Sequence, residues 1–430
     1  MFEDDAVMVD RPNAPSQYLH SISTYVQDIK RELRKLSIEI HDNPELQYKE
    51  FHAHNVLTNY LKDQKGWHVT PSAYDIKTAF VAVYDSGKRG PVVSFNAEYD
   101  ALKGIGHACG HNLIAIASVG GALATARLVE EESLGGKVVL FGTPAEEGGG
   151  GKIKLLNAGA YRDNNVDISL ISHPGISSDS AVTRTAAYTS FKVEYFGREA
   201  HAAARPWDGI NALDALITAY NAISVLRQQT QPGDIIQGQI INGGLRPNII
   251  HAYASGMFVV RSSTRARREA LKKRVMSCFE AGATATGATL NVTPKGSYDD
   301  HMPNKTLASS FRSAFNHLGG EIPDQEIDYL TGSTMASTDQ GDVSYAMPSI
   351  SPNFWIRSEG EDGKQLGGPH TPDFERAART EEAHDLALRV AIALSATAVD
   401  VLTDEDLLRQ AKREFEEMKQ QDADLIGAQS

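Results

Sequence analysis

A fifteen-residue stretch of this chain gathers the side chains that most readily bind metal ions. From Glu98 to Asn112 it reads Glu-Tyr-Asp-Ala-Leu-Lys-Gly-Ile-Gly-His-Ala-Cys-Gly-His-Asn, with one of only two cysteines in the chain. Thiolate, imidazole and carboxylate groups are ligands of transition metals. Taken alone, Cys109-Gly-His111 fits a buried cysteine beside a histidine at a helix start equally well. A metal site is therefore a hypothesis that other residues must support.

Two adjacent glutamates offer the pair of carboxylates that metal-assisted hydrolysis requires. Glu146 and Glu147 follow an apolar run at residues 137–142, and four glycines at 148–151 come next. The glycines allow a sharp backbone turn, so that one carboxylate can bind a metal while the other acts as general base toward water. A phosphate-binding loop is excluded, because Lys152 is followed by isoleucine and not by serine or threonine.

Two histidines elsewhere in the chain complete a set of candidate ligands. His173 follows the apolar run at residues 166–171, and His370 lies in the loop Gly-Gly-Pro-His-Thr-Pro at residues 367–372. A single catalytic zinc needs only three protein ligands. Five candidates therefore suit two metal ions that share one site: Cys109, His111, Glu147, His173 and His370.

The candidate ligands fall where a parallel sheet would bring them together. The pattern predicts strands at residues 78–84, 92–95, 137–142 and 166–171, and helices at residues 17–40, 50–62, 113–128 and 152–158. We expect the first two strands to pair. Strands that alternate with helices indicate an α/β fold with a mainly parallel sheet. Ligands in such folds bind at the carboxyl ends of the strands, which is where most of the candidates lie.

The pattern changes near residue 187 and returns near residue 295. Between them, the order strand–helix–strand–strand–helix–strand predicts an inserted α+β domain. A charged helix is expected at residues 405–421. We predict a flexible arm (1–15), a catalytic domain in two parts (16–186 and 295–402), the inserted domain (187–294) and a charged helical tail (403–430).

The composition is that of a soluble globular protein with two domains. The 430 residues are 41% hydrophobic and 23% charged. The net charge of −13 argues against nucleic acid and against an anionic membrane surface as partners. Cys109 and Cys278 are too few for a disulfide framework, and the acidic start does not read as a secretory signal. We expect a cytoplasmic protein without membrane spans.

Over roughly residues 17–402 the chain resembles peptidase family M20, the metallohydrolases of the aminoacylase and carboxypeptidase type. It is most similar to the amidohydrolase branch with a cysteine ligand, in the group of the aminobenzoyl-glutamate hydrolases and the M20 domain-containing protein 2 enzymes. The resemblance rests on the stretch 98–112 and on His41-Asp-Asn-Pro-Glu-Leu, Thr143-Pro-Ala-Glu-Glu, His173-Pro, the residues around His201, Ser337-Thr-Asp and Pro369-His-Thr-Pro.

The resemblance implies a role for each candidate residue. The five candidate ligands match the family's metal ligands, Glu146 its general base, and Asp100 the acid that orients the metal site. His201 matches a histidine that stabilises the oxyanion across a dimer interface. Asn248 and Arg261 match residues that hold the substrate carboxylate. The family also implies two divalent ions, zinc or in its place manganese or cobalt, a ferredoxin-like inserted lid domain and homodimers formed through it.

We therefore expect a metal-dependent hydrolase that cleaves the amide bond of N-acyl amino acids, dipeptides or related conjugates. Two alternatives stay open. The chain could be a catalytically silent binding or regulatory relative, although such a protein should lack a ligand or the base. It could also form amide bonds at the same site. The expected partners are a small amide substrate and a second copy of the chain.

Overall fold

The larger part of the protein is built on one six-stranded sheet. The computed structural model describes residues 16–360 and 362–429, so the predicted arm at 1–15 lies outside the described residues. The strand order is β1-β2-β4-β3-β5-β13. The strands are β1 (Trp67–Pro71), β2 (Phe80–Asp85), β3 (Val92–Glu98), β4 (Lys137–Thr143), β5 (Ile168–Leu170) and β13 (Ser349–Ile350).

The predicted parallel sheet is confirmed, with one correction to its pairing. β4, β3, β5 and β13 run parallel, and β1 and β2 are antiparallel at one edge. The expected pairing of β2 with β3 is wrong, because β4 lies between them. The β2–β4 register puts Phe80 opposite Gly142. A Cβ atom at Gly142 would lie 2.1 Å from the Phe80 ring, so glycine makes room for this pairing.

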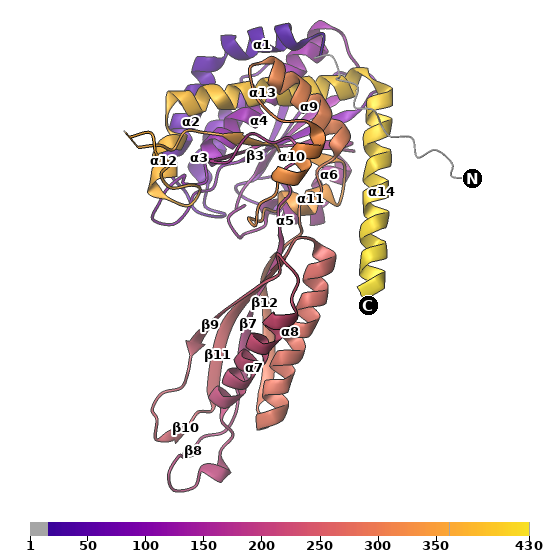
Figure 1. Cartoon of the computed structure of the whole chain (residues 1–430). Helices are drawn as coiled ribbons and strands as arrows, with labels where there is room; N and C mark the ends of the chain where they lie inside the picture. The colour runs from indigo at the N-terminus through magenta and orange to yellow at the C-terminus, as the bar shows by residue number, and fades with distance from the viewer. Residues whose placement is uncertain (1–15, 361, 430) are drawn as a thin grey trace, which may run out of the picture.

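Helices cover both faces of the sheet (Figure 1). Residues alternate along β4, where Val138 and Leu140 belong to one core and Val139 and Phe141 to the other. The first core contains α1 (Leu19–Asp28), α2 (Lys30–Asp42), α3 (Phe51–Lys62), α4 (His111–Glu131), α9 (Lys305–His317) and α13 (Glu381–Thr403). The second contains α5 (Gly151–Asn157), α6 (Ala160–Asp163) and α11 (Gln340–Ser344).

One detail of the helical layer differs from the sequence prediction, and the burial of two long apolar helices is a second feature of this layer. The helix predicted at residues 17–40 is divided into α1 and α2, because Ile29 departs from helical geometry at φ −94° and ψ 6°. By length and composition α4 and α13 could each cross a membrane, but 94% and 72% of their apolar windows are buried within the protein. Both helices are thus core elements of this fold.

An antiparallel sheet with two helices projects from this body (Figure 1). Its elements are β7 (Ala187–Phe196), α7 (Ala212–Leu226), β9 (Ile235–Asn242), β11 (Tyr253–Ser262), α8 (Arg265–Thr286) and β12 (Thr289–Tyr298). The strand order β12-β7-β11-β9 is that of a ferredoxin-like fold, as predicted. The predicted boundary at residue 294 falls inside β12, because a bulge between Pro294 and Gly296 lets the strand continue.

The far end of this inserted domain carries a small ribbon of β8 (Ala200–His201) and β10 (Ile249–Ile250). The remaining elements close the catalytic part. They are β6 (His173–Gly175), which pairs with β14 (Asn353–Trp355), and the helices α10 (Gln325–Thr331), α12 (Pro372–Ala378) and α14 (Glu405–Gln429). α14 is longer than the helix predicted at 405–421. Its Asp422 bonds Arg265 at the start of α8 at 2.5 Å, so α14 contacts both parts of the protein.

Candidate metal centre

The five predicted ligands lie together at the carboxyl ends of the central strands. Two groups of them have donor atoms within 4.8 Å of one another. The first group is Cys109, His111 and His173, and the second is Cys109, Glu147 and His370. Because Cys109 belongs to both groups, the arrangement suits two ions on either side of its sulfur.

Hydrogen bonds fix which nitrogen of each histidine faces the centre. His173 donates from Nδ1 to the carbonyl oxygen of Pro174 at 2.7 Å, which leaves Nε2 facing the Cys109 sulfur at 3.4 Å. His111 Nδ1 lies 3.2 Å from Asp100 Oδ1, which leaves its Nε2 for a ligand. A histidine held through one nitrogen presents the other in a fixed direction, as metal ligands commonly do.

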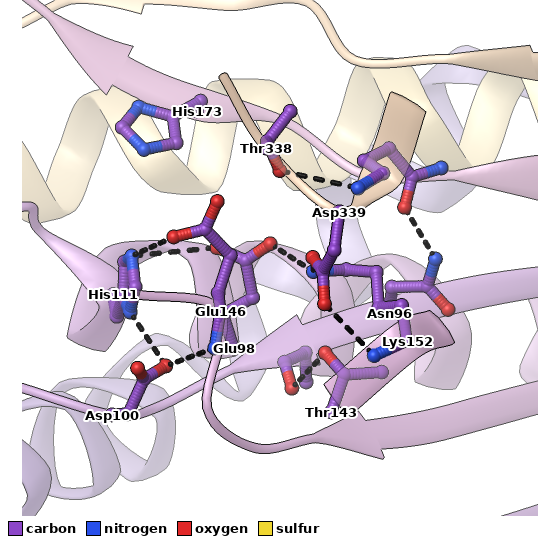
Figure 2. A network of polar contacts seen from close by, with 12 residues as sticks. Asn96, Glu98, Asp100, His111, Thr143, Glu146, Lys152, His173, Thr338 and Asp339 are labelled. Carbon is purple, nitrogen blue, oxygen red and sulfur yellow. Dashed lines mark hydrogen bonds and ion pairs between the residues drawn. The ribbon is translucent and has the colours of Figure 1, made fainter. Parts of the chain in front are cut away.

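Asp100 also holds the loop that carries the two glutamates, and its bond to Glu146 is drawn in Figure 2. Its Oδ1 accepts a hydrogen bond from the backbone of Glu146 at 3.1 Å, and its Oδ2 from that of Glu147 at 3.0 Å. One carboxylate thus positions the metal-facing imidazole, the candidate base and a candidate ligand. This geometry supports the orienting role expected for Asp100.

The glutamate loop is held in an unusual backbone conformation. Ala145 has φ +59°, in the left-handed region that non-glycine residues rarely adopt. Glu50 stabilises this turn, because its Oε1 accepts the Ala145 N–H at 2.9 Å. The predicted sharp turn at the glycines is also present, with Gly148 at φ +99° and Gly150 at φ +64°. No motif or spacing in the sequence singles out Glu50.

His370 reaches the centre from the far end of the chain. Its backbone N–H donates to Ala108 at 2.8 Å, which fixes the loop beside Cys109. Its Nε2 lies 3.4 Å from Glu147 Oε1. The residue has φ +70°, so the backbone is strained where the candidate ligand is presented.

Unpaired buried atoms indicate that the residues fit a metal. Among the described residues, His111 Nε2 and Glu147 Oε1 are buried without a hydrogen-bond partner. They lie 3.8 Å apart. Buried polar atoms without a partner are costly, and an ion held by each of the two groups would satisfy its own member of this pair. The soft sulfur, the imidazoles and the carboxylate are the donor set expected for zinc-like ions.

The electrostatics point the same way. Burial raises the pKa of Glu146 well above its usual range, and the carboxylates of Glu98 and Glu147 raise it further. Burial and the charge of Glu147 likewise raise the pKa of the Cys109 thiol. The site therefore concentrates groups that ionise only with positive charge beside them.

A cavity of about 520 Å³ opens beside these residues. It is lined by Cys109, Glu146, Glu147, His173 and His370, and by Arg261 from the inserted domain. The Arg261 guanidinium donates to Ser337 Oγ at 2.8 Å and lies 5.0 Å from the centre of the Tyr188 ring. Within one chain, His201 and Asn248 are not brought to this cavity. They lie at the β8–β10 ribbon, at the far end of the inserted domain.

A buried ion-pair cluster behind the site was not predicted. Lys152 is fully buried, and its Nζ lies 2.5 Å from both Glu98 Oε1 and Asp339 Oδ1 (Figure 2). The sequence pattern predicts no structural role for Lys152 and no ligand role for Glu98. The available signal was the position of Glu98, at the carboxyl end of β3 like the other candidates.

Fold and site together are those of a metallohydrolase, with candidate ligands for two metal ions and a candidate carboxylate base at one cavity. Residues 91–393 match the model of peptidase family M20/M25/M40. The chain belongs to this family. It is a metal-dependent hydrolase of amide bonds.

Individual relatives support this assignment over nearly the whole chain. Xaa-Arg dipeptidase of Mus musculus is 37% identical over 401 residues, covering 91% of this chain and 90% of the relative. One of the p-aminobenzoyl-glutamate hydrolase subunits of Escherichia coli is 27% identical and covers 88% and 91%. In fold, the chain is similar to a dinuclear metal-binding M20 peptidase of Bacillus subtilis, with a TM-score of 0.62 at 19% identity and coverage of 89% and 99%.

Proposed function

We propose that this protein hydrolyses the amide bond of dipeptides and N-acyl amino acids with two divalent metal ions, and that these ions are zinc. The observation that carries the proposal is the convergence of five candidate ligands, of which four line the cavity together with Glu146 and the fifth, His111, is buried beside them. Bound ions would supply Lewis acidity toward the amide carbonyl and lower the pKa of water. Manganese and cobalt are the alternatives for the same donors. The complete set favours catalysis over a silent relative.

Glu146 is the residue that moves the proton. Its Oε2 lies 3.9 Å from His111 Nε2, and it is almost completely buried at the edge of the cavity. The carboxylate accepts a proton from the attacking water and passes it to the departing amine nitrogen. The backbone bonds of Asp100 keep it beside the ligand set during both transfers.

The cavity recognises the substrate by charge at two points. Arg261 would pair with the carboxylate of the amino acid released by the reaction. Asp179 also lines the cavity, and its Oδ1 accepts the Trp355 N–H at 2.8 Å. Within residues 16–360 and 362–429, its Oδ2 accepts no hydrogen bond. A carboxylate there favours a cationic side chain, as in the dipeptides for which the mouse relative is named.

The proposal includes a homodimer formed through the inserted domain. His201 and Asn248 lie beside strongly exposed apolar residues, Trp207 at 72% and Leu245 at 85%. Apolar side chains with such high exposure are typical of a surface that a partner covers. A second copy would cover them and bring its His201 and Asn248 toward the cavity of the first. His201 would then stabilise the oxyanion.

A cytoplasmic location completes the proposal. Cys109 and Cys278 are both free, which suits a reducing compartment.

A hydrolysis screen of the purified protein tests this function. Dipeptides with arginine, lysine, alanine or glutamate at the C-terminus and N-acyl amino acids would be offered with zinc, manganese or cobalt. We expect cleavage that chelation abolishes and metal restores, with basic dipeptides preferred. No cleavage of any amide by protein that holds two ions would contradict the proposal.

A further inference from the structure

Glu98 has one oxygen bound and one oxygen free. The residue ends β3, its side chain is buried, and Oε1 is held by Lys152 at 2.5 Å. Its other oxygen, Oε2, is buried without a hydrogen-bond partner among the described residues. A buried carboxylate oxygen left unpaired in this way is costly and requires an explanation.

The free oxygen points at the metal centre. Glu98 Oε2 lies 3.5 Å from Nε2 of His111, the nitrogen that Asp100 leaves available for an ion (Figure 2). Two donors bound to one zinc at about 2.1 Å in tetrahedral geometry lie about 3.4 Å apart. Glu98 Oε2 is therefore spaced from His111 as a second ligand of the same ion would be. Like His111 Nε2 and Glu147 Oε1, Glu98 Oε2 is buried without a hydrogen-bond partner among the described residues.

We propose that Glu98 is a further metal ligand, which binds through Oε2 the ion held by His111. This inference rests on the proposed function, because it adds a sixth protein ligand to the same two-metal site. The donor atoms of Glu98, His111 and Glu146 also lie within 4.8 Å of one another. Glu98 thus binds Lys152 through Oε1 and faces the metal centre with Oε2.

Lys152 and Asp339 explain how Glu98 keeps this orientation. The Lys152 ammonium is fully buried between the two carboxylates, and its backbone N–H donates to Asp339 Oδ2 at 2.8 Å. Lys152 is therefore held through both its backbone N–H and its ammonium group. It can bind only one oxygen of Glu98 closely, and the other is left to the ion. The positive charge also offsets a carboxylate that would otherwise add to a crowded negative site.

Metal binding without substrate tests the assignment. Apoprotein of the wild type, Glu98→Gln and Asp339→Asn would be titrated with Zn²⁺ against a chromophoric chelator and with Co²⁺ by visible absorption. Asp339→Asn is the matched control, because it removes a nearby buried charge and a Lys152 contact but no donor atom. We expect Glu98→Gln to weaken one of two zinc sites at least about tenfold and to change the cobalt spectrum. We expect Asp339→Asn, which loosens Lys152 but removes no donor atom, to weaken this site clearly less than Glu98→Gln does and to keep the wild-type spectrum.

Four outcomes would overturn or separate the claims. Wild-type affinities and spectrum in Glu98→Gln would overturn the assignment, and so would equal losses in Glu98→Gln and Asp339→Asn. If Glu98→Gln fails to fold by circular dichroism, Glu98→Asp decides. It keeps the charge for Lys152 but withdraws the carboxylate by one methylene, so it should lose the same site, and unchanged binding again overturns the claim. A wild type that binds no metal would instead overturn the proposed function itself.

Discussion

Asp100 shows how much of the site depends on single residues. Its two oxygens serve His111 and the backbone of both glutamates. The types and strand-end positions of the ligands could be predicted from the sequence, because carboxyl ends of parallel strands meet at one edge. The role of Lys152 could not be, since lysine is almost never fully buried and its partner Asp339 is 187 positions away.

Asp179 provides a prediction about substrate choice. Asp179→Asn keeps the size of the side chain but removes the charge that faces the cavity. We expect kcat/KM for a dipeptide with C-terminal arginine to fall about tenfold, the loss of one charged contact. The value for the matching dipeptide with C-terminal alanine should stay within about twofold. Equal losses on both substrates would show that Asp179 does not read the cationic side chain.

Glu50 gives a prediction about stability against pH. Burial raises its pKa from 4.5 to about 7, so the folded protein holds this proton more tightly than the unfolded chain does. The contribution of the protonated acid to stability is therefore present at low pH and is lost as pH rises from about 4.5 to above 7. Glu50→Gln mimics the protonated acid and should remove this loss.

The measurement is the free energy of unfolding of wild type and Glu50→Gln by urea, from pH 5 to pH 8. We expect the free energy of unfolding of Glu50→Gln to rise relative to that of the wild type as pH rises, by up to roughly 3 kcal/mol. A constant difference across this range would mean that the carboxyl of Glu50 is already ionised at pH 5.

The elements that carry the ligands were those that the sequence predicted best. Apolar runs in the sequence predict β3 and β4, which precede candidate ligands. Alternation of apolar and polar residues predicts β7 of the inserted sheet equally well. The edge strand β1 was not predicted, because its Trp-His-Val-Thr-Pro sequence is short, half-exposed and ends in proline. The two-residue strand β13 is also too short for a periodic signal. Its pairing with β5 depends on contacts far apart in the chain.

Tyr298 links two elements that the sequence does not connect. It ends β12 of the inserted domain, and its hydroxyl donates to the carbonyl oxygen of Glu146 at 2.7 Å. The same hydroxyl accepts the Gly150 N–H at 2.9 Å. The centres of the Tyr298 and Tyr188 rings lie 5.1 Å apart, and the ring planes make an angle of 82°. Arg261 lies over the same Tyr188 ring. The last strand of the inserted domain therefore holds the loop of the candidate base.

Tyr298→Phe tests this link. The change leaves two backbone groups of the loop without a buried partner, which costs about 1–3 kcal/mol. We expect kcat to fall about tenfold, with KM within about twofold, because the base is displaced while Arg261 is unchanged. The control Tyr345→Phe removes a hydroxyl that bonds Asp300, away from the glutamate loop, and should keep kcat. A raised KM with unchanged kcat in Tyr298→Phe would contradict the positioning role.

At the scale of the whole molecule, one chain does not assemble every residue expected at the site. Four of the five candidate ligands, Glu146 and Arg261 line the cavity, whereas His201 and Asn248 lie at the far end of the inserted domain (Figure 1). Sequence alone could not show this separation, because His201 and Arg261 lie in the same predicted domain. Their distance follows from the length of the projecting sheet (Figure 1).

Mixing two inactive variants tests whether a second copy completes the site. Glu146→Gln lacks the base and His201→Ala lacks the expected oxyanion donor, so each homodimer should be nearly inactive. A mixed dimer has one site with both residues intact. After co-refolding at equal amounts, random pairing should restore about a quarter of wild-type activity. Activity no higher than the sum of the two variants would exclude sharing of the site between copies.

Hydrolysis by Glu146→Gln at known metal content tests the central claim most directly. Wild type and variant would be loaded with zinc, checked for equal metal per chain, and compared on the best substrate of the screen. We predict two ions in each protein and a kcat/KM about a thousandfold lower in Glu146→Gln, because only the proton carrier is lost. Equal rates in the two proteins at equal metal content would contradict the role of Glu146 as the base.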